Sequence, residues 1–186
     1  MPGGLVHEAY RREGGWSLIE LKLSHPAQLF NSLDPSPFRE RDLDVEAADY
    51  IVDAVRELHG HNRLKLVFYF PGAVDDRTRA TLADALANYF LYREQAARLS
   101  VRNILRLGRT SLLVGLLFLA ACVGLAQLVF TGEDVTSKLL HEGFVIVGWV
   151  AMWRPLEILL YDWWPVLRDA RLYRRIAAMP IELRTS

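Results

Sequence analysis

The sequence predicts an α+β membrane protein, in which a two-helix transmembrane hairpin is joined to a small cytoplasmic α/β domain. The first observation behind this prediction is the run 111-SLLVGLLFLAACVGLAQLVF-130, which contains no charged residue. At about 1.5 Å per residue, this run is long enough to cross roughly 30 Å of hydrocarbon. The second observation is another apolar run, which begins at Phe144. The third is a strand–helix–strand pattern near the N-terminus, with one more strand-like segment at the C-terminus.

The α/β domain is expected to follow a flexible, polar N-terminal arm, residues 1–15, and to cover residues 16–77. Its first element is 17-SLIELKL-23, where apolar and polar side chains alternate as in a strand with one apolar face. The next stretch, residues 24–42, contains three prolines and is predicted to be mostly loop.

The domain continues with a helix and a second strand. Asp44 suits the N-cap of the helix, and 64-LKLVFYF-70 is rich in the branched and aromatic residues of a buried strand. A crossover of this length predicts that the two strands are parallel and joined with a right-handed connection. Residues 166–186 are expected to form a helix and a strand, because 180-PIELRT-185 resembles 18-LIELKL-23. This last strand is predicted to return to the sheet, so that both ends of the chain build one βαβ-based domain.

The membrane part is divided into four segments. Residues 78–109 are predicted to form an amphipathic, arginine-rich helix that leads into transmembrane helix 1, residues 110–131. Residues 132–143 form an external connector, and residues 144–165 form transmembrane helix 2, kinked at Pro155. A soluble protein with two buried helices is the alternative, but a domain this small could not bury both.

Arginines predict the orientation of the hairpin. The connector carries only Lys138, whereas basic residues cluster on the other side of each span: Arg93, Arg98, Arg102, Arg106, Arg109, Arg168, Arg171, Arg174 and Arg175. The positive-inside rule therefore puts both termini in the cytoplasm and the connector outside. The polar N-terminus lacks the apolar core of a signal peptide, which agrees with this orientation.

Composition narrows the function classes. Lys+Arg and Asp+Glu are both 22, so the basic excess of a nucleic-acid-binding protein is missing. The single cysteine and the spacing of the five histidines give no disulfide framework and no zinc pattern. We see no local catalytic motif, and therefore expect no catalytic residues, no metal and no cofactor.

The most unusual chemistry is expected in the second span, where 154-RPLE-157 interrupts an apolar run. At 100° per residue, Arg154, Glu157 and Tyr161 form an intramembrane polar stripe. An arginine in hydrocarbon costs about 2.5–3.5 kcal/mol, and Glu157 is close enough to pair with it. The alternative is structural: if the helix starts near Val135, Arg154 lies close to the cytoplasmic edge and snorkels to headgroups.

Three other groups of residues are candidates for contacts. Arg98, Arg102, Arg106 and Arg109 form a basic stripe suited to lipid headgroups, although it is also explained as a topology signal. The loop before Asp44 offers Phe38, Arg39, Arg41 and Asp42 for assembly or a ligand, although a solvated loop is the simpler interpretation. The small-xxx-small surface of the first span, Ala120, Gly124 and Gln127, is predicted to pack closely against another helix.

Together, 36-SPFRERDLD-44, the arginine-rich helix entering a span and 153-WRPLEILLYDWWP-165 resemble an uncharacterised family of bacterial two-span inner-membrane proteins. This resemblance covers most of the chain. It implies a location in the bacterial inner membrane and attaches no activity.

Three functions are compatible with these features. The leading hypothesis is a non-enzymatic protein of the lipid bilayer that forms a homo-oligomer through its hairpin and uses the α/β domain for assembly or for binding an unknown protein partner. The second is an oligomeric channel or transport element, with Arg154 and Glu157 lining the pathway. The third is an enzyme that acts on lipid at the cytoplasmic surface.

Overall fold

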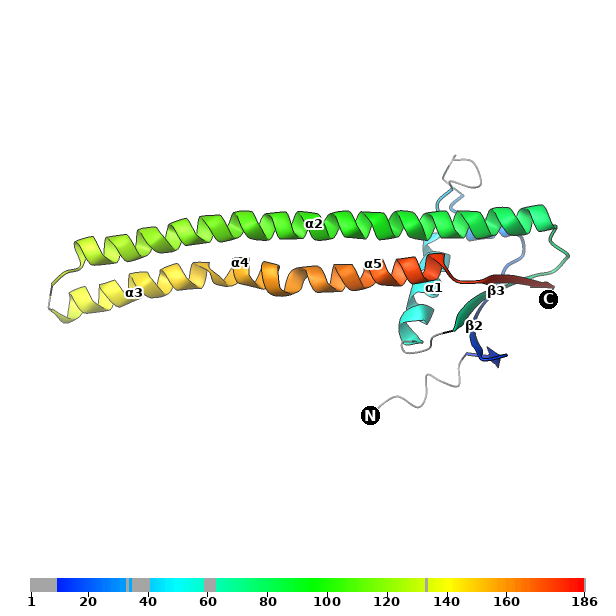
Figure 1. The fold of residues 1–186 in the computed structure, drawn as a ribbon, viewed down its shortest axis with the longest axis horizontal. Helices are drawn as coiled ribbons and strands as arrows, with labels where there is room; N and C mark the ends of the chain where they lie inside the picture. The colour runs from blue at the N-terminus through cyan, green and yellow to red at the C-terminus, as the bar shows by residue number, and fades with distance from the viewer. Residues whose placement is uncertain (1–9, 33, 35–40, 59–62, 133, 186) are drawn as a thin grey trace. The chain divides into compact units, whose positions relative to one another are not determined.

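The computed structural model describes residues 10–32, 34, 41–58, 63–132 and 134–185. The chain forms two compact units, one made of residues 1–96 with 169–186 and the other of residues 97–168. The first unit contains a four-stranded sheet with helices, and the second contains two long antiparallel helices (Figure 1). These helices are long and apolar enough to cross a membrane. The predicted mixed architecture is therefore confirmed.

The sheet has the order β1-β2-β3-β4. Its strands are β1 (Arg12–Glu13), β2 (Trp16–Lys22), β3 (Leu64–Phe70) and β4 (Ile181–Thr185). β2 and β3 are parallel, and β4 pairs with β3 in parallel as well. Both the parallel pair and the return of the C-terminal strand were predicted and are confirmed. The antiparallel strand β1 was missed, because two residues are too few to show a pattern.

The helices of the first unit cover one face of this sheet. α1 (Val45–Glu57) connects β2 to β3, and its N-cap Asp44 accepts hydrogen bonds from the backbone N–H groups of Glu46 and Ala47. The connection from β3 to β4 runs across the sheet in the same direction, so right-handed crossovers put its helices on the same side as α1. The core between these layers contains Ile19, Leu66, Phe68 and Ile51, each at most 1% exposed.

Two side-chain contacts join the helices of this unit. Arg56 of α1 forms an ion pair with Asp169 at 3.1 Å. Arg93 donates hydrogen bonds to the hydroxyl groups of Tyr89 and Tyr173, at 2.9 and 3.0 Å. Asp169 and Tyr173 lie near the C-terminus, so these contacts reinforce the pairing of β4 with β3 in joining the two ends of the chain.

The second unit is a hairpin of long helices. α2 (Asp76–Val129) is one continuous helix of 54 residues, and only its part from residue 97 belongs to this unit. α3 (Val135–Ala151) begins at Val135, where the carboxylate of Asp134 caps it by accepting from the N–H of Ser137 at 3.0 Å. Most of the predicted connector 132–143 is therefore helical. The second long helix begins nine residues before Phe144, where the second span was expected to start, as in the alternative interpretation of the sequence.

The second helix of the hairpin is irregular around Pro155. After α3, a turn at Met152 leads into α4 (Trp153–Glu157), the π-helix η3 (Ile158–Asp162) and α5 (Trp163–Ala177). Proline has no backbone N–H to donate to the carbonyl four residues earlier, at Ala151. The N–H of Met152 donates to the carbonyl of Trp149, three residues earlier, at 3.0 Å, as in a tightened turn. The wider π turn follows directly.

The two helices of the hairpin approach each other at three glycines. A Cβ built on Gly108 would lie 2.7 Å from Leu159, one on Gly115 would lie 3.0 Å from the sulfur of Met152, and one on Gly148 would lie 2.8 Å from Leu119. Along α2 this seam repeats every three or four residues, as in an antiparallel coiled coil: Gly108, Leu112, Gly115, Leu119, Cys122 and Ala126.

The residues predicted to pack closely lie outside this seam. Ala120 and Gln127 are exposed, and a Cβ on Gly124 would meet no atom within 4 Å. Their side of α2 is therefore not used within the hairpin.

Replacing Gly148 with alanine should destabilise the hairpin by about 1–3 kcal/mol, because its new methyl group would overlap Leu119 and the backbone-linked Cβ of Cys122. Gly124→Ala and Gly143→Ala are matched controls, since neither meets an atom within 4 Å and alanine favours helix by up to about 1 kcal/mol. Unfolding in detergent micelles measures the difference. Equal stability of the three variants would contradict the proposed seam.

Candidate functional site

The second helix carries a charged triad on its outer surface. Arg154 donates through Nη1 to Oε2 of Glu157 at 2.9 Å and forms an ion pair through Nη2 with Oδ2 of Asp162 at 3.2 Å. The three side chains are 65%, 46% and 34% exposed, respectively. The predicted pair of Arg154 and Glu157 thus forms with good geometry, and Asp162 joins it. One cation faces two anions, so the triad has a formal charge of −1.

Asp162 reaches Arg154 because of the π-helix. In a regular α-helix, two positions eight residues apart differ by about 80° around the axis. Each turn of η3 holds more residues than an α-turn, which rotates Asp162 back toward the side of Arg154. Helical-wheel reasoning with a constant 100° step placed Tyr161 on the stripe and missed Asp162. Tyr161 is 61% exposed, and its ring lies 6.5 Å from that of Trp164.

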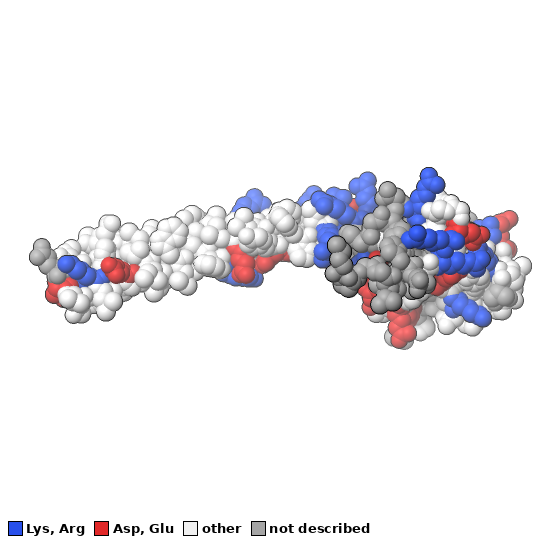
Figure 2. Space-filling view, turned by 90° about the horizontal axis from the view of Figure 1, so that it is seen from below, with Lys and Arg blue, Asp and Glu red and all other residues white. Residues whose placement is uncertain are grey.

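The seam contacts show how deep the triad lies along the hairpin. Met152 and Pro155 lie against Gly115, and Ile158 and Leu159 lie against Gly108. The triad is therefore level with residues 108–115 of α2, and Phe130 at the connecting turn is about 22 Å away from Gly115 along the helix. The stretch 143–153 on the other helix contains no charged residue over about 16 Å. In Figure 2, the corresponding part of the hairpin is white between its charged end and the next charged group.

Large aromatic side chains lie next to the triad residues in the sequence. Trp153 is 75% exposed, Tyr161 61% and Trp164 59%. Trp163 is half-buried and donates from Nε1 to the carbonyl of Leu159 at 2.9 Å, within the distorted segment. Exposed tryptophan and tyrosine beside charged groups are typical of the boundary between hydrocarbon and headgroups. The triad and the aromatic residues therefore have the composition of an interfacial belt.

The predicted basic stripe lies on the same unit. Arg98, Arg102, Arg106 and Arg109 are all exposed, and Nε of Arg109 donates to the carbonyl of Leu105 at 3.3 Å. Arg106 and Arg109 flank Gly108, so they are level with Ile158 and Leu159, between the two acids of the triad. These four arginines and Arg154 outnumber the two carboxylates by three, which makes this end of the hairpin attractive to anionic headgroups.

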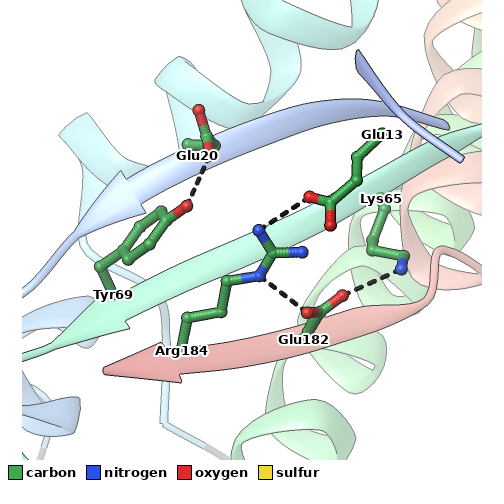
Figure 3. A network of polar contacts seen from close by, with 6 residues as sticks. All are labelled: Glu13, Glu20, Lys65, Tyr69, Glu182 and Arg184. Atoms are coloured by element: carbon green, nitrogen blue, oxygen red, sulfur yellow. Dashed lines mark hydrogen bonds and ion pairs between the residues drawn. The ribbon is translucent and has the colours of Figure 1, made fainter. Parts of the chain in front are cut away.

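A second polar cluster lies on the sheet of the other unit (Figure 3). Arg184 forms ion pairs with Glu182 at 2.7 Å and with Glu13 at 2.9 Å, and Lys65 pairs with Glu182 at 2.9 Å. Tyr69 donates to Glu20 at 2.7 Å. The strand register places Glu182 beside Val67 and Arg184 beside Tyr69, so all these side chains project from the face opposite the helices.

The electrostatics of this cluster are those of a stable ion-pair network. Hydrogen bonds from Arg184 and Lys65 lower the pKa of Glu182 from 4.5 to about 2. The hydrogen bond with Glu182 raises the pKa of Arg184 above its ordinary value. Lys65, Arg184, Glu182 and Glu13 each have an oppositely charged partner. The network therefore joins β1, β3 and β4.

The predicted ligand loop is only partly within the described residues, because Phe38 and Arg39 lie outside them. The backbone N–H of Asp42 donates to Asp34 at 2.7 Å, and the carbonyl of Asp42 accepts from Asn31 at 2.8 Å. Asp42 therefore anchors the end of the loop. Nε of Arg41 is buried without a hydrogen-bond partner in the described part of the chain.

A nearby open cleft of about 550 Å³ lies between the end of β2 and the start of α1. This is the usual place for a ligand in an α/β fold. However, the side chain of Asp44 already accepts from two of the N–H groups at the start of α1. In the described residues, no group of three or more His, Cys, Asp or Glu side chains could hold a metal ion.

No protein-family model, curated protein or solved structure matches this chain. The resemblance to bacterial two-span inner-membrane proteins stays a prediction.

Changing both acids of the triad should destabilise the hairpin more than the sum of the single changes. Glu157→Gln or Asp162→Asn alone leaves Arg154 with one carboxylate and should cost less than about 1 kcal/mol, as is usual for exposed pairs. The double variant leaves Arg154 without a carboxylate partner. Adding Arg154→Gln to it should recover part of the lost stability. Denaturant unfolding in micelles measures this coupling, with Glu142→Gln as a control outside the triad. Additive single effects would contradict a shared guanidinium.

Proposed function

We propose that this chain is a non-enzymatic membrane protein that self-assembles through its hairpin and uses its α/β unit for assembly or for binding a protein partner. The observation that carries the proposal is the exposed apolar surface of both helices. Only 17% and 22% of their most apolar windows are buried within the chain. Leu117, Leu128 and Ile146 are among the large side chains that are more than 60% exposed. An apolar surface of this extent needs lipid or other copies of the chain to cover it.

The sheet supports placing both ends of the hairpin on one side of the membrane. β3 precedes the hairpin and β4 follows it, and these strands are hydrogen-bonded to each other. The chain between them must therefore cross the bilayer an even number of times. The arginine asymmetry favours the cytoplasm as the side that contains the sheet. The inner membrane of a bacterium is the location that the resemblance implies.

In this arrangement the triad lies near the cytoplasmic boundary of the bilayer. The exposed tryptophans, the arginines of α2 and the distance from the connecting turn all support this depth. Arg154 can extend toward headgroups there, while Glu157 and Asp162 balance its charge. A structural, interfacial role is therefore favoured over a buried ion site.

The same geometry disfavours a conducting path. Between residues 143 and 153 the second helix offers no charged side chain to line a pore. At Gly115 and Gly148 the side chains of one helix pack directly against the other helix, which leaves no room for a path between them. Any path would have to run between copies and past apolar side chains over about 16 Å.

Assembly is proposed to use the outward side of α2. Gly124 is open to close approach, and Ala120 is exposed one turn away. Gln127 is exposed and can form a hydrogen bond to a neighbouring helix. Small residues with a polar group nearby favour helix association in membranes, where the hydrophobic effect between helices is absent.

The orientation can be checked by cysteine labelling in intact cells, in a Cys122→Ala background that removes the only native cysteine. Thr136→Cys, exposed near the connecting turn, should react with a membrane-impermeant maleimide from outside. Asp49→Cys, exposed on α1, should react only after the cells are lysed. External labelling at position 49 would contradict the proposed orientation.

Gly124→Ile should reduce self-assembly by at least tenfold in association constant, because a large side chain would separate two helices that meet at this position. Within the chain the Cβ of the new side chain meets no atom within 4 Å, so the hairpin itself should stay folded. Gly143→Ile is the matched control on α3, where a Cβ also meets no atom within 4 Å. Förster transfer between labelled copies in lipid vesicles measures association. Equal transfer for both variants would contradict assembly through this side of α2.

A further inference from the structure

The outer edge of β4 has backbone groups available for pairing. β4 is the last strand in the sheet order, and its inner side is hydrogen-bonded to β3. The N–H of Leu66 donates to the carbonyl of Pro180 at 3.1 Å, which fixes the alternation along the strand. The backbone groups of Glu182 and Arg184 then point toward β3, and those of Ile181, Leu183 and Thr185 point away from the sheet. Within the described residues, no backbone hydrogen bond outside the sheet uses these three residues.

The opposite edge of the sheet is too short to pair with another chain. There, β1 pairs with β2 through two residues only and makes a short edge. β4 has five residues, and an open groove of about 490 Å³ lies beside its first residue, Ile181. Alanines form much of this groove: Ala80, Ala83, Ala87 and Ala177. Small side chains here leave room for a neighbouring chain next to the strand.

The sequence of β4 is complementary to itself. If two copies pair in antiparallel fashion about a two-fold axis at Leu183, Ile181 lies opposite Thr185 of the other copy, and Leu183 lies opposite itself. In this register, the N–H and C=O groups that point away from one sheet lie opposite those that point away from the other sheet. Antiparallel hydrogen bonding requires this arrangement.

The charges select this register. With the axis at Leu183, Glu182 lies opposite Arg184 of the other copy, which puts opposite charges in closely spaced cross-strand positions. An axis at Glu182 would place this glutamate opposite itself, and an axis at Arg184 would do the same for the arginine. Like charges directly opposite each other are destabilising, so both alternatives are disfavoured.

We propose that two copies of this chain pair through their β4 edges and form one continuous sheet. On the face opposite the helices, the network of Lys65, Glu182, Arg184 and Glu13 would then continue into the second copy. This inference deepens the proposed function, because it assigns the assembly role of the α/β unit to one strand and to a second copy as its partner. It uses a surface separate from Gly124.

The test is a disulfide across the two-fold axis in the full-length protein in lipid vesicles. In a Cys122→Ala background, Leu183→Cys places two cysteines opposite each other, at the Cα separation of about 5.5 Å that suits a disulfide. Mild oxidation should crosslink most of the protein, whereas Asp49→Cys on α1 should crosslink at least tenfold more slowly. Failure of Leu183→Cys to crosslink faster than this control would overturn the proposal and would mean that charge alone protects the edge.

Charge reversal tests the register. Glu182→Arg alone and Arg184→Glu alone each put like charges opposite one another in a homodimer, so crosslinking at position 183 should fall at least tenfold. When the two variants are mixed, every cross-strand pair is again opposite in charge, and the crosslink should return. If the mixture does not recover, the proposed register is wrong.

A further variant leaves all charges unchanged, so it tests the pairing even if charge reversal disturbs folding. The N–H of Thr185 points outward, so Thr185→Pro removes a donor to the second copy without removing a hydrogen bond to β3. It should slow the crosslink, and Thr185→Ala should not. Unchanged crosslinking in Thr185→Pro would overturn the backbone pairing.

Combining the crosslink with Gly124→Ile separates the two proposals. A crosslink that persists when Gly124→Ile removes hairpin association supports both surfaces. Loss of the crosslink with Gly124-dependent association intact rejects the β4 pairing alone, and the reverse result rejects the hairpin interface alone.

Discussion

The hydrogen bonding of β4 to β3 determines the topology of the whole chain. These strands are separated by more than 100 residues, yet they are neighbours in one sheet. Everything between them has to leave the sheet and return to it. A membrane hairpin satisfies this condition because it crosses twice, and a single span would not. The sheet and the arginine asymmetry are therefore independent arguments for the same arrangement, one from hydrogen bonding and one from charge.

Pro155 has the same importance within the hairpin. Proline removes one backbone donor, so the carbonyl of Ala151 lacks its usual helical partner. A tightened turn at Met152 precedes the proline, and a π-helix follows Glu157. The wider turn changes which side chains share a face and brings Asp162 to Arg154 at 3.2 Å. The triad therefore depends on the π-helix that follows Pro155.

The sequence predicted those parts of the fold that depend on regular patterns. Alternation along β2, the branched and aromatic residues of β3, the length of the crossover between them and the similarity of 180–185 to 18–23 were enough to predict the parallel sheet. The start of α3 was misplaced because the segment 132–143 is polar, although polar side chains are compatible with a capped helix. Asp162 was missed because a constant angular step cannot represent a π-helix. The glycines of the seam were visible in the sequence, but which glycines face the partner helix depends on the rotation of each helix, which packing decides.

The pKa of Glu182 determines whether a contact at the β4 edge depends on pH. Glu182 has a folded-state pKa of about 2, below its ordinary value of 4.5. A depressed carboxylate pKa contributes stability above the ordinary value, and this contribution is lost as the pH falls from about 4.5 to about 2. Because Glu182 is partly exposed, solvent screening keeps the contribution small, about 1 kcal/mol or less. Near neutral pH Glu182 is ionised, so its pairing with Arg184, within one copy or between two, is constant. The charge pattern of β4 therefore determines which partner and which register fit, and it does not make the contact sensitive to pH.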